Sequence, residues 1–285
     1  MQLHSMTVLQ SFPPEICSLI CQDPILERLE LNSICFISHA FRNEAQRELS
    51  SRFPCLRGAN QVNAWCLSLR HKPLLAKKTK GLVLLLPRPS PFKFDKEDIA
   101  RLEWALRKCK NLKELVVLFQ GRYRRRREPY ETLSSSFLCR HRFRLTKLVN
   151  GYFSHDSVFR EFLRDQPNLE SLELHSGKMN GTNRVYRLRH LNTLSCPARF
   201  LHVSYRVERL RLDFENSTDD DDEYEEIDVL GRLLKRNLNR NMKSLVMFFA
   251  QSQTQFPEII RVIAASRIYI QHLEIHQFLP TEVRV

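Results

Sequence analysis

The hydrophobic residues of positions 1–55 recur with the 3.6-residue period of amphipathic helices. Pro13 and Pro14 precede the first apolar stripe, where the N–H that proline lacks would have no helical partner. Ser38 is placed to cap a third helix. The stripes contain, in order, Ile16, Leu19 and Ile20, then Leu26, Leu29, Ile34 and Ile37, then Phe41, Ala45 and Leu49. The pattern predicts three short helices, too small for an independent core, so we expect this module to pack on the rest of the chain or on a partner.

From Lys80 onward the hydrophobic residues follow a different spacing, in which two apolar positions three apart are followed by a third after two more positions. The spacing occurs five times, at residues 112–117, 169–174, 207–212, 242–247 and 270–275. It is the strand signature of a leucine-rich repeat. Shorter fragments occur at residues 145–148 and 191–194. Stretches of helical period precede most of these strands, which predicts a parallel sheet with helices on its outer face.

The fold class that follows is α/β, with a short N-terminal helical module and an irregular leucine-rich-repeat solenoid. The expected boundaries are 1–55 for the module, 56–79 for a connecting helical segment and 80–285 for the repeat domain. Unequal intervals between the strands make the solenoid irregular. The alternative is an ordinary α/β sheet whose strands resemble one another by chance, and five matches to one spacing favour the repeat interpretation.

The spacing also predicts which side chains face a target. The residue between the last two apolar positions of each strand points to the concave side, away from the helices. The predicted target-binding residues are Val116, Glu173, Arg211, Val246 and Glu274, with Glu114, Ser171, Arg209, Ser244 and His272 on the same side. This mixed surface suits a protein target better than a phosphate backbone. A solvated face without a partner stays open as the alternative, because exposed strand positions are polar by default.

The composition, with 42% hydrophobic and 27% charged residues among 285, is that of a soluble globular protein. Residues 1–10 lack the pattern of a secretory signal, and no run approaches the ~20 apolar residues of a membrane span. The 8 cysteines are scattered among apolar neighbours, so we interpret them as small buried hydrophobes rather than disulfide partners or zinc ligands. We therefore expect a cytoplasmic or nuclear protein with no membrane partner.

Charge is unevenly distributed along the chain, whose formal net charge is +13. A basic patch comprises Arg122, Arg124, Arg125, Arg126 and Arg127, and an acidic run spans residues 219–226. Because like charges repel and stay out of cores, we interpret both first as solvated loops. Two alternatives stay open for the basic patch: a nuclear-localisation signal, or a nucleic-acid site in which Tyr123 stacks on a base while the arginines neutralise phosphates.

Motifs of catalysis are missing from the sequence. The chain has 7 glycines, and they form neither of the phosphate-binding patterns G-x-x-x-x-G-K-S/T and G-x-G-x-x-G. There is no G-x-S-x-G elbow, no H-E-x-x-H, and no recognisable Ser–His or Cys–His constellation. We therefore expect a binding protein rather than an enzyme, with no cofactor and no metal.

Two segments of the module carry a resemblance to a known family. The sequence from Phe12 to Ile16, followed by Ile20, resembles the L-P-x-E-I/L…I opening of an F-box. Ile37 to Arg42 resembles the V-S-K-x-W/F-R start of the third F-box helix. Together with the repeats, the chain is similar to the fungal F-box-like proteins with C-terminal leucine-rich repeats. It departs from them at Phe12, where the family usually has leucine.

The resemblance implies a function without catalysis, as a substrate-recruiting adaptor of a cullin-RING ubiquitin ligase. In the family, the box binds a Skp-type adaptor that links it to a cullin scaffold, and the repeats present a protein target. The implied adaptor contacts are Phe12, Pro13, Ile16, Ile20, Ile37 and Phe41. One alternative is that Ile16, Ile20 and Phe41 form the core of the box itself. Another is a nucleic-acid-binding or scaffold protein that uses the basic loop at residues 122–127.

Overall fold

The computed structural model of the chain describes residues 12–87, 96–119, 138, 143–175, 188–201, 206–214, 220–236, 242–250 and 256–278. Its N-terminal part contains the three short helices that the sequence predicts: α1 (Pro14–Gln22), α2 (Arg28–Ile34) and α3 (His39–Arg52). Ser38 caps α3, since its Oγ accepts a hydrogen bond from the N–H of Phe41 at 3.3 Å. Glu27 and Glu30 form a capping box at the start of α2.

The core of this helical module is small, and a buried arginine holds its helices together. The core residues are Cys17, Cys21, Leu31, Phe41, Ala45 and Phe53. Arg52 is 4% exposed, and its Nε lies 3.0 Å from Glu48 Oε2. The same guanidinium donates to the carbonyl oxygens of Cys21 in the last turn of α1 and of Asp23 and Leu26 before α2, at 2.8–3.2 Å. One charged side chain therefore joins the end of α3 to the chain that links α1 and α2.

The rest of the described chain builds one nine-stranded parallel sheet whose strand order follows the sequence, β1 to β9. The strands are β1 (Cys55–Arg57), β2 (Gly81–Leu86), β3 (Glu114–Phe119), β4 (Lys147–Asn150), β5 (Ser171–Leu174), β6 (Thr193–Pro197), β7 (Arg209–Phe214), β8 (Ser244–Ala250) and β9 (Leu273–Phe278). Each unit therefore adds beside the previous one, which is the arrangement of a solenoid. The predicted α/β repeat architecture is confirmed, and the two sequence fragments at residues 145–148 and 191–194 lead into the strands β4 and β6.

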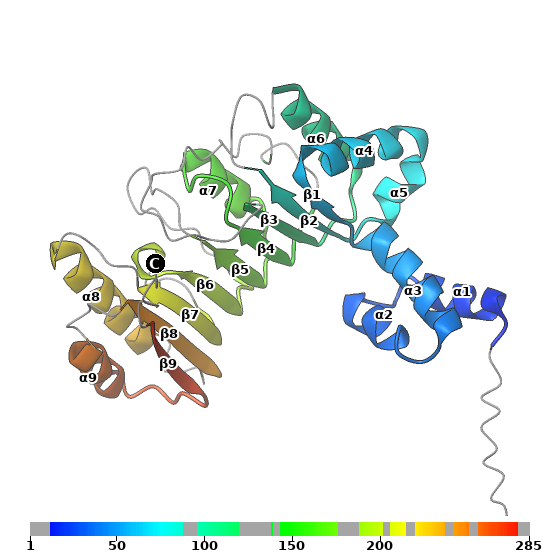
Figure 1. Cartoon of the computed structure of the whole chain (residues 1–285). Helices are drawn as coiled ribbons and strands as arrows, with labels where there is room; N and C mark the ends of the chain where they lie inside the picture. Colours follow the sequence, from blue (N-terminus) through cyan, green and yellow to red (C-terminus); the bar gives the residue numbers. More distant parts are fainter. Residues whose placement is uncertain are drawn as a thin grey trace, which may run out of the picture.

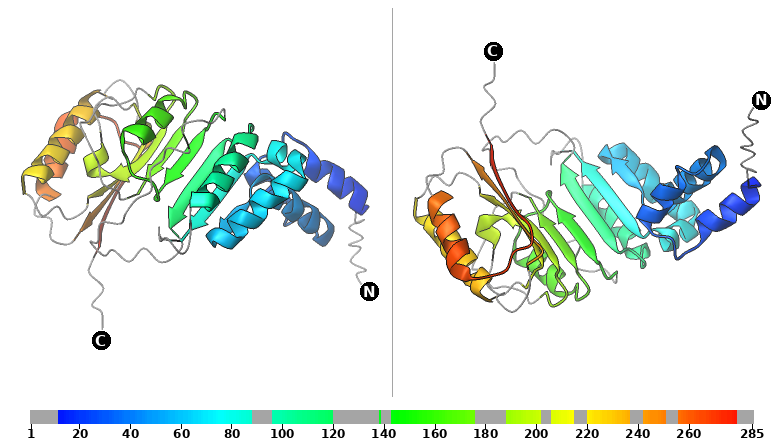
Figure 2. Two further views of the ribbon diagram at one scale, coloured as in Figure 1. Left: turned by 90° about the horizontal axis from the view of Figure 1, so that it is seen from above. Right: turned by 90° about the horizontal axis from the view of Figure 1, so that it is seen from below.

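The helices of the repeat domain lie on one face of this sheet (Figure 1). They are α4 (Gly58–His71), α5 (Pro73–Lys78), α6 (Lys96–Lys108), α7 (Ser157–Arg164), the 3₁₀ turn η2 (Ala198–Phe200), α8 (Asp220–Arg236) and α9 (Phe256–Ser266). We call the other face of the sheet the open face. The α1–α3 module and strand β9 lie at opposite ends of the molecule (Figure 2).

A row of leucines fills the space between sheet and helices. Adjacent strands place these leucines in register, and they are Leu82, Leu115, Leu148, Leu172, Leu194, Leu210, Leu245 and Leu273. The first seven are at most 1% exposed, whereas Leu273 on the last described strand is 44% exposed. Each strand thus buries the same position of the repeat against the same position of its neighbours.

The segment 56–79 is helical, as predicted, but it also belongs to the repeats. It follows directly from β1, a strand that the sequence analysis did not predict and that pairs in parallel with β2. Val62 and Leu69 of α4 and Ala76 of α5 are buried in the core of the sheet domain. The first repeat therefore starts at Cys55, before the predicted boundary at residue 80.

From Asp220 onward, the acidic run predicted as a solvated loop is helical; residue 219 lies outside the described residues. Helix α8 begins at Asp220 and carries the acidic residues in its first turns. Negative charge is favourable there because the N-terminus of a helix carries a partial positive charge. The helix continues into its apolar stripe, in which Ile227, Leu230 and Leu234 are buried.

The module is attached to the first repeats by backbone hydrogen bonds and by one close approach. The N–H of Lys80 donates to Arg52 at 2.7 Å, and the N–H of Val83 donates to Pro54 at 2.9 Å. Gly81 has no side chain where the Phe53 ring passes, and a Cβ there would lie 2.6 Å from Phe53 Cδ1. The end of α3 therefore packs directly on the edge where β2 begins.

The described cysteines are free thiols. Cys17, Cys21, Cys66, Cys109 and Cys196 are buried, which fits the prediction of small buried hydrophobes, whereas Cys55 is exposed. Burial raises the pKa of Cys66 to about 11 and that of Cys109 to about 12. In the described ranges, no helix is long and apolar enough to cross a membrane.

Candidate functional site

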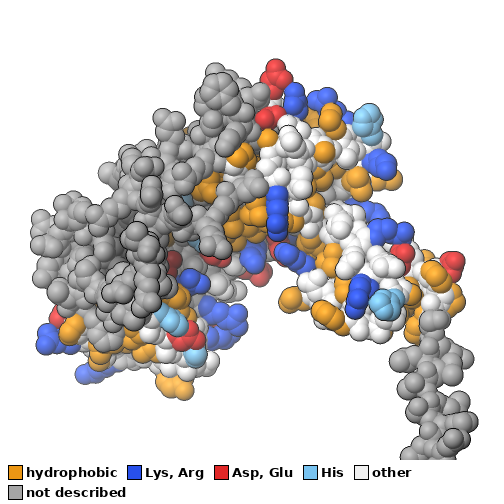
Figure 3. Space-filling model, in the orientation of Figure 1, with side chains coloured by type: hydrophobic (Ala, Val, Ile, Leu, Met, Phe, Trp, Pro, Cys, Tyr) orange, Lys and Arg blue, Asp and Glu red, His pale blue; other side chains and the backbone are white. Residues whose placement is uncertain are grey.

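The helical module exposes a dense set of large hydrophobic side chains (Figure 3). Ile16 and Ile20 are four residues apart and so lie along one side of α1, and Phe12 lies just before the helix. The side chains of Cys17 and Cys21, one position further along, turn into the module core. Ile37, just before the cap of α3, is 59% exposed. The α1 side and the start of α3 thus present apolar residues to solvent.

Five of the six predicted adaptor contacts are exposed, namely Phe12, Pro13, Ile16, Ile20 and Ile37. The sixth, Phe41, is 5% exposed and belongs to the module core. Its ring packs edge-on against Phe12, with the ring centroids 5.9 Å apart. Phe41 therefore packs beneath the exposed Phe12 ring. Its own side chain is buried, whereas the resemblance implied that it would contact the adaptor directly.

Sequence reasoning missed several members of this surface. Leu29 and Ile25 are about 80% exposed, and Phe36 is 82% exposed. The helical period placed Leu29 in an apolar stripe, but α2 has only two turns and buries only Leu31. We call the exposed hydrophobic residues of 12–37 the apolar surface of the module; they are Phe12, Ile16, Leu19, Ile20, Ile25, Leu29, Phe36 and Ile37.

The open face of the sheet brings the predicted target-binding residues into one row. Val116, Glu173, Arg211, Val246 and Glu274 occupy equivalent register positions, and Val149 of β4 and Ser195 of β6 complete the row between them. The predicted placement is therefore confirmed, although the sequence assigned no residue to β4 or β6. Two positions further along each strand, a second row contains Leu85, Leu118, Asp213, Phe248 and His276.

The two ends of the open face differ in chemistry. On β2 to β4, the middle of the face is aliphatic and includes the half-buried Val83, Val116 and Leu118, while Glu114 and Lys147 lie at the start of β3 and β4. Gly151 follows β4 on this face. A Cβ there would lie 2.8 Å from Leu118 Cδ2 and 3.2 Å from His175 Cβ, so side chains of the two neighbouring repeats pack closely over this glycine. From β5 to β9 the face becomes charged and aromatic. A partner that binds the open face would thus contact an aliphatic end and a polar end.

At the polar end, side chains from three strands stack across the sheet. The guanidinium carbon of Arg211 lies 4.3 Å from the centroid of the Phe248 ring, which is cation–π distance. The Phe248 ring stacks on His276, with centroids 4.7 Å apart and planes at 10°. Arg211 Nε lies 3.9 Å from Asp213 Oδ1. The stack leaves an arginine and a histidine at the surface, where they are available to an aromatic or acidic partner group.

Two carboxylates on the open face are held by histidines. His276 Nε2 lies 2.9 Å from Glu274 Oε2, and His272 contacts the other oxygen of that carboxylate. These two hydrogen bonds lower the pKa of Glu274. The pKa of Glu173 is also lowered, first by the hydrogen bond from His175, at 3.1 Å, and then by the charges of Arg211 and Lys147. Both glutamates are thereby kept ionised, as fixed negative charges on the binding surface.

Two further features of the sequence are the charged segments and the possible metal ligands. The basic patch at Arg122 and residues 124–127 lies outside the described residues, as do the side chains of residues 219–226. In the described part of the chain, no three His, Cys, Asp or Glu side chains gather where they could hold a metal ion.

Comparison with known proteins leaves the fold as the main guide. No family model matches the sequence, and neither the curated proteins nor the solved structures give a match. The class that the structure defines is an α/β protein in which a three-helix module precedes a nine-stranded parallel repeat sheet.

Proposed function

We propose that the chain is a substrate-recruiting adaptor of a cullin-RING ubiquitin ligase. In this proposal, the apolar surface of the module binds a Skp-type adaptor, and the open face of the sheet binds a protein target. The observation that carries it is the imbalance within the module, which exposes eight large hydrophobic side chains between residues 12 and 37 and buries a core of six. Exposed apolar area of this kind marks interaction sites when it is large.

The F-box resemblance supports the identity of the first partner. Of the large hydrophobic residues that carry the resemblance, Phe12, Ile16, Ile20 and Ile37 are exposed, and Phe41 is buried beneath Phe12. Ile16 and Ile20 lie on α1, so little backbone entropy would be lost there when a partner covers them. Large apolar side chains presented in this way are typical of the central anchors of protein interfaces.

The open face supports a protein as the second partner. Its aliphatic end offers area that a partner can desolvate, and its polar end offers Arg211, Glu173 and Glu274 for ion pairs and hydrogen bonds. A face that combines apolar and charged groups of both signs suits a protein surface better than a polyanion. The target would contact several repeats at once, because the row of Val116, Glu173 and Arg211 crosses strands β3 to β7.

The proposal is tested by calorimetric titration of the full chain with a recombinant Skp-type adaptor. We expect saturable one-to-one binding that weakens at least about tenfold in the variant Phe12→Ala/Ile16→Ala, because each truncation removes an interface anchor. The matched control is Leu67→Ala/Leu74→Ala, which truncates two exposed leucines of α4 and α5. If the folded chain fails to bind at micromolar concentration, or if both variants weaken binding equally, the proposal is wrong.

A further inference from the structure

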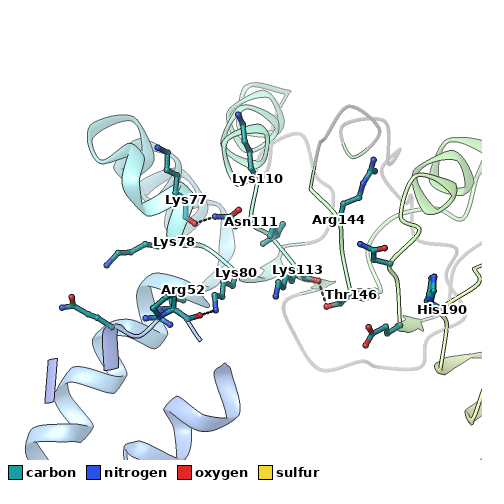
Figure 4. Close-up of a pocket in the computed structure, with 15 residues that line it drawn as sticks. Arg52, Lys77, Lys78, Lys80, Lys110, Asn111, Lys113, Arg144, Thr146 and His190 are labelled. Atoms are coloured by element: carbon teal, nitrogen blue, oxygen red, sulfur yellow. Dashed lines mark hydrogen bonds between the residues drawn. The ribbon is translucent and has the colours of Figure 1, made fainter. Parts of the chain in front are cut away.

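A basic groove of about 860 Å³ lies along the edge of the sheet where the strands begin. Its walls come from the module, through Arg52, and from the segments that immediately precede β2, β3, β4, β5 and β6 (Figure 4). The groove is separate from the open face, because its repeat-domain residues precede the strands that form that face, and none of its lining residues belongs to the apolar surface of the module.

Backbone hydrogen bonds fix equivalent residues of successive repeats along the groove. The N–H of Lys113 donates to the carbonyl of Lys80 at 2.7 Å, and the N–H of Thr146 donates to Lys113 at 2.8 Å. The N–H of Glu170 continues the ladder to Thr146 at 2.9 Å. The side chains of different repeats are therefore presented side by side at the spacing of neighbouring strands, about 4.8 Å.

Positive charge dominates the groove. Seven of its lining residues are lysines or arginines, and a single lining residue, Glu170, is acidic. Some of the cations are already neutralised: Arg52 pairs with Glu48, while Lys80 and Lys113 lie 3.9 Å and 3.8 Å from Glu27.

Three of the cations have no carboxylate at ion-pair distance among the described residues; they are Lys77, Lys110 and Arg144, and all are exposed. Arg144 donates to the main-chain carbonyl of Asp165 at 2.6 Å, which orients its guanidinium without neutralising it. Exposed like charges that face one groove repel one another, and an anionic ligand would relieve that repulsion.

The polar residues of the groove indicate the class of ligand. Asn111, Thr146 and Asn168 also line the groove. Asn111 and Thr146 donate to the carbonyls of Lys77 and Lys113, and their side-chain oxygens can still accept hydrogen bonds from peptide N–H groups. The described lining contains no Phe, Tyr or Trp on which a base could stack. We propose that this groove binds an extended acidic segment of a partner protein, through salt bridges to Lys77, Lys110 and Arg144. This binding does not require the module to bind a Skp-type adaptor.

The test is fluorescence anisotropy of the full chain with a labelled peptide of twelve residues in which Glu and Asp alternate with Ser. The groove variant is Lys77→Glu/Lys110→Glu/Arg144→Glu. The matched control is Arg232→Glu/Lys235→Glu/Arg261→Glu, which makes the same change of net charge on α8 and α9. We expect the groove variant to weaken binding by about tenfold or more and the control by less than about threefold, because three ion pairs become three repulsions only in the groove.

A milder variant guards against loss of fold. Lys77→Gln/Lys110→Gln changes two exposed side chains without a carboxylate partner in the described chain, and we expect it to weaken peptide binding measurably while circular dichroism stays unchanged. Equal losses in the groove and control variants would overturn the proposal in favour of diffuse attraction to a basic protein. So would tighter binding of a twelve-nucleotide single strand through the same residues. Phe12→Ala/Ile16→Ala should leave peptide binding intact, which separates this test from that of the adaptor.

Discussion

The helical module and the repeat domain differ in how many of their large hydrophobic residues they bury. In the repeat domain, a leucine of each strand lies beside the same leucine of the next, and seven of the eight in that row are at most 1% exposed. In the module, six residues form the core while eight large hydrophobics face solvent. The repeat domain buries its apolar surface between its own stacked repeats. The module leaves much of its apolar surface exposed, and in our proposal a partner covers it.

The largest expected effect concerns the charged side chain that holds the module together. Arg52→Ala should lower the free energy of unfolding of the module by about 3–5 kcal/mol, because it leaves the buried Glu48 with only the more distant, exposed Lys78 at 3.7 Å and frees three carbonyls. The control Arg47→Ala removes a pair between the exposed Arg47 and the half-buried Glu44, together with a hydrogen bond to Ser18, and should cost about 1 kcal/mol. Urea unfolding followed by circular dichroism measures both, and similar values for the two variants would contradict the role assigned to Arg52.

The next effect separates a buried leucine from an exposed one. Leu172→Ala, in the middle of the row, should cost about 2–5 kcal/mol because it leaves a cavity between sheet and helices. Leu29→Ala, in the apolar surface of the module, should change stability by about 0.5 kcal/mol or less. A large loss at Leu29 would mean that this leucine packs inside the protein, and the comparison of the two regions would fail.

A smaller effect tests how the two regions join. Gly81→Ala should cost about 1–3 kcal/mol, since its Cβ would collide with the Phe53 ring. In a Phe53→Leu background the same change should cost less, because the shorter side chain leaves room for the methyl group. A double-mutant cycle by thermal unfolding measures the difference. Equal costs in both backgrounds would show that the ring and the glycine are not in contact.

The smallest effect is electrostatic and lies on the open face. The pKa of Glu173 is lowered chiefly by the hydrogen bond from His175, so His175→Ala should raise it toward the ordinary value. Because the folded pKa is depressed, this interaction stabilises the protein above the unfolded pKa, about 4.3, and the stabilisation is lost as the pH falls through the folded pKa. Carboxyl NMR titration measures the shift. His276→Ala is the control, and an equal effect on Glu173 would contradict the assignment.

The sequence predicts the repeat sheet well because its signal is local. In the motif of strand β5, Leu169, Leu172 and Leu174 fix which side chains face the core, so the parity of Glu173 follows from the spacing alone. Strand β1 was not predicted, because Cys55–Arg57 has a single buried residue and lacks the repeat spacing. The acidic start of α8 was predicted as a loop, because like charges repel one another. The helix dipole favours the same residues at a helix N-terminus, where the structure has them.

The candidate sites are less predictable because they join residues that are far apart in the chain. Arg211, Phe248 and His276 stack only because three repeats bring them into register. The groove cations Lys77, Lys110 and Arg144 are each about one repeat apart, and no local pattern links them. In the module, Phe41 and Leu29 both lie in apolar stripes, and only packing determines that Phe41 is buried and Leu29 is not.

The central claim is that residues 12–37 form a surface that a partner covers. Hydrogen–deuterium exchange of the full chain, alone and with a saturating Skp-type adaptor, tests it most directly. We predict slower exchange in α1 and in the segment from Leu29 to Ile37, with no change in strands β3 to β9. Exchange that stays the same in the module, or that slows on the open face instead, would contradict the account.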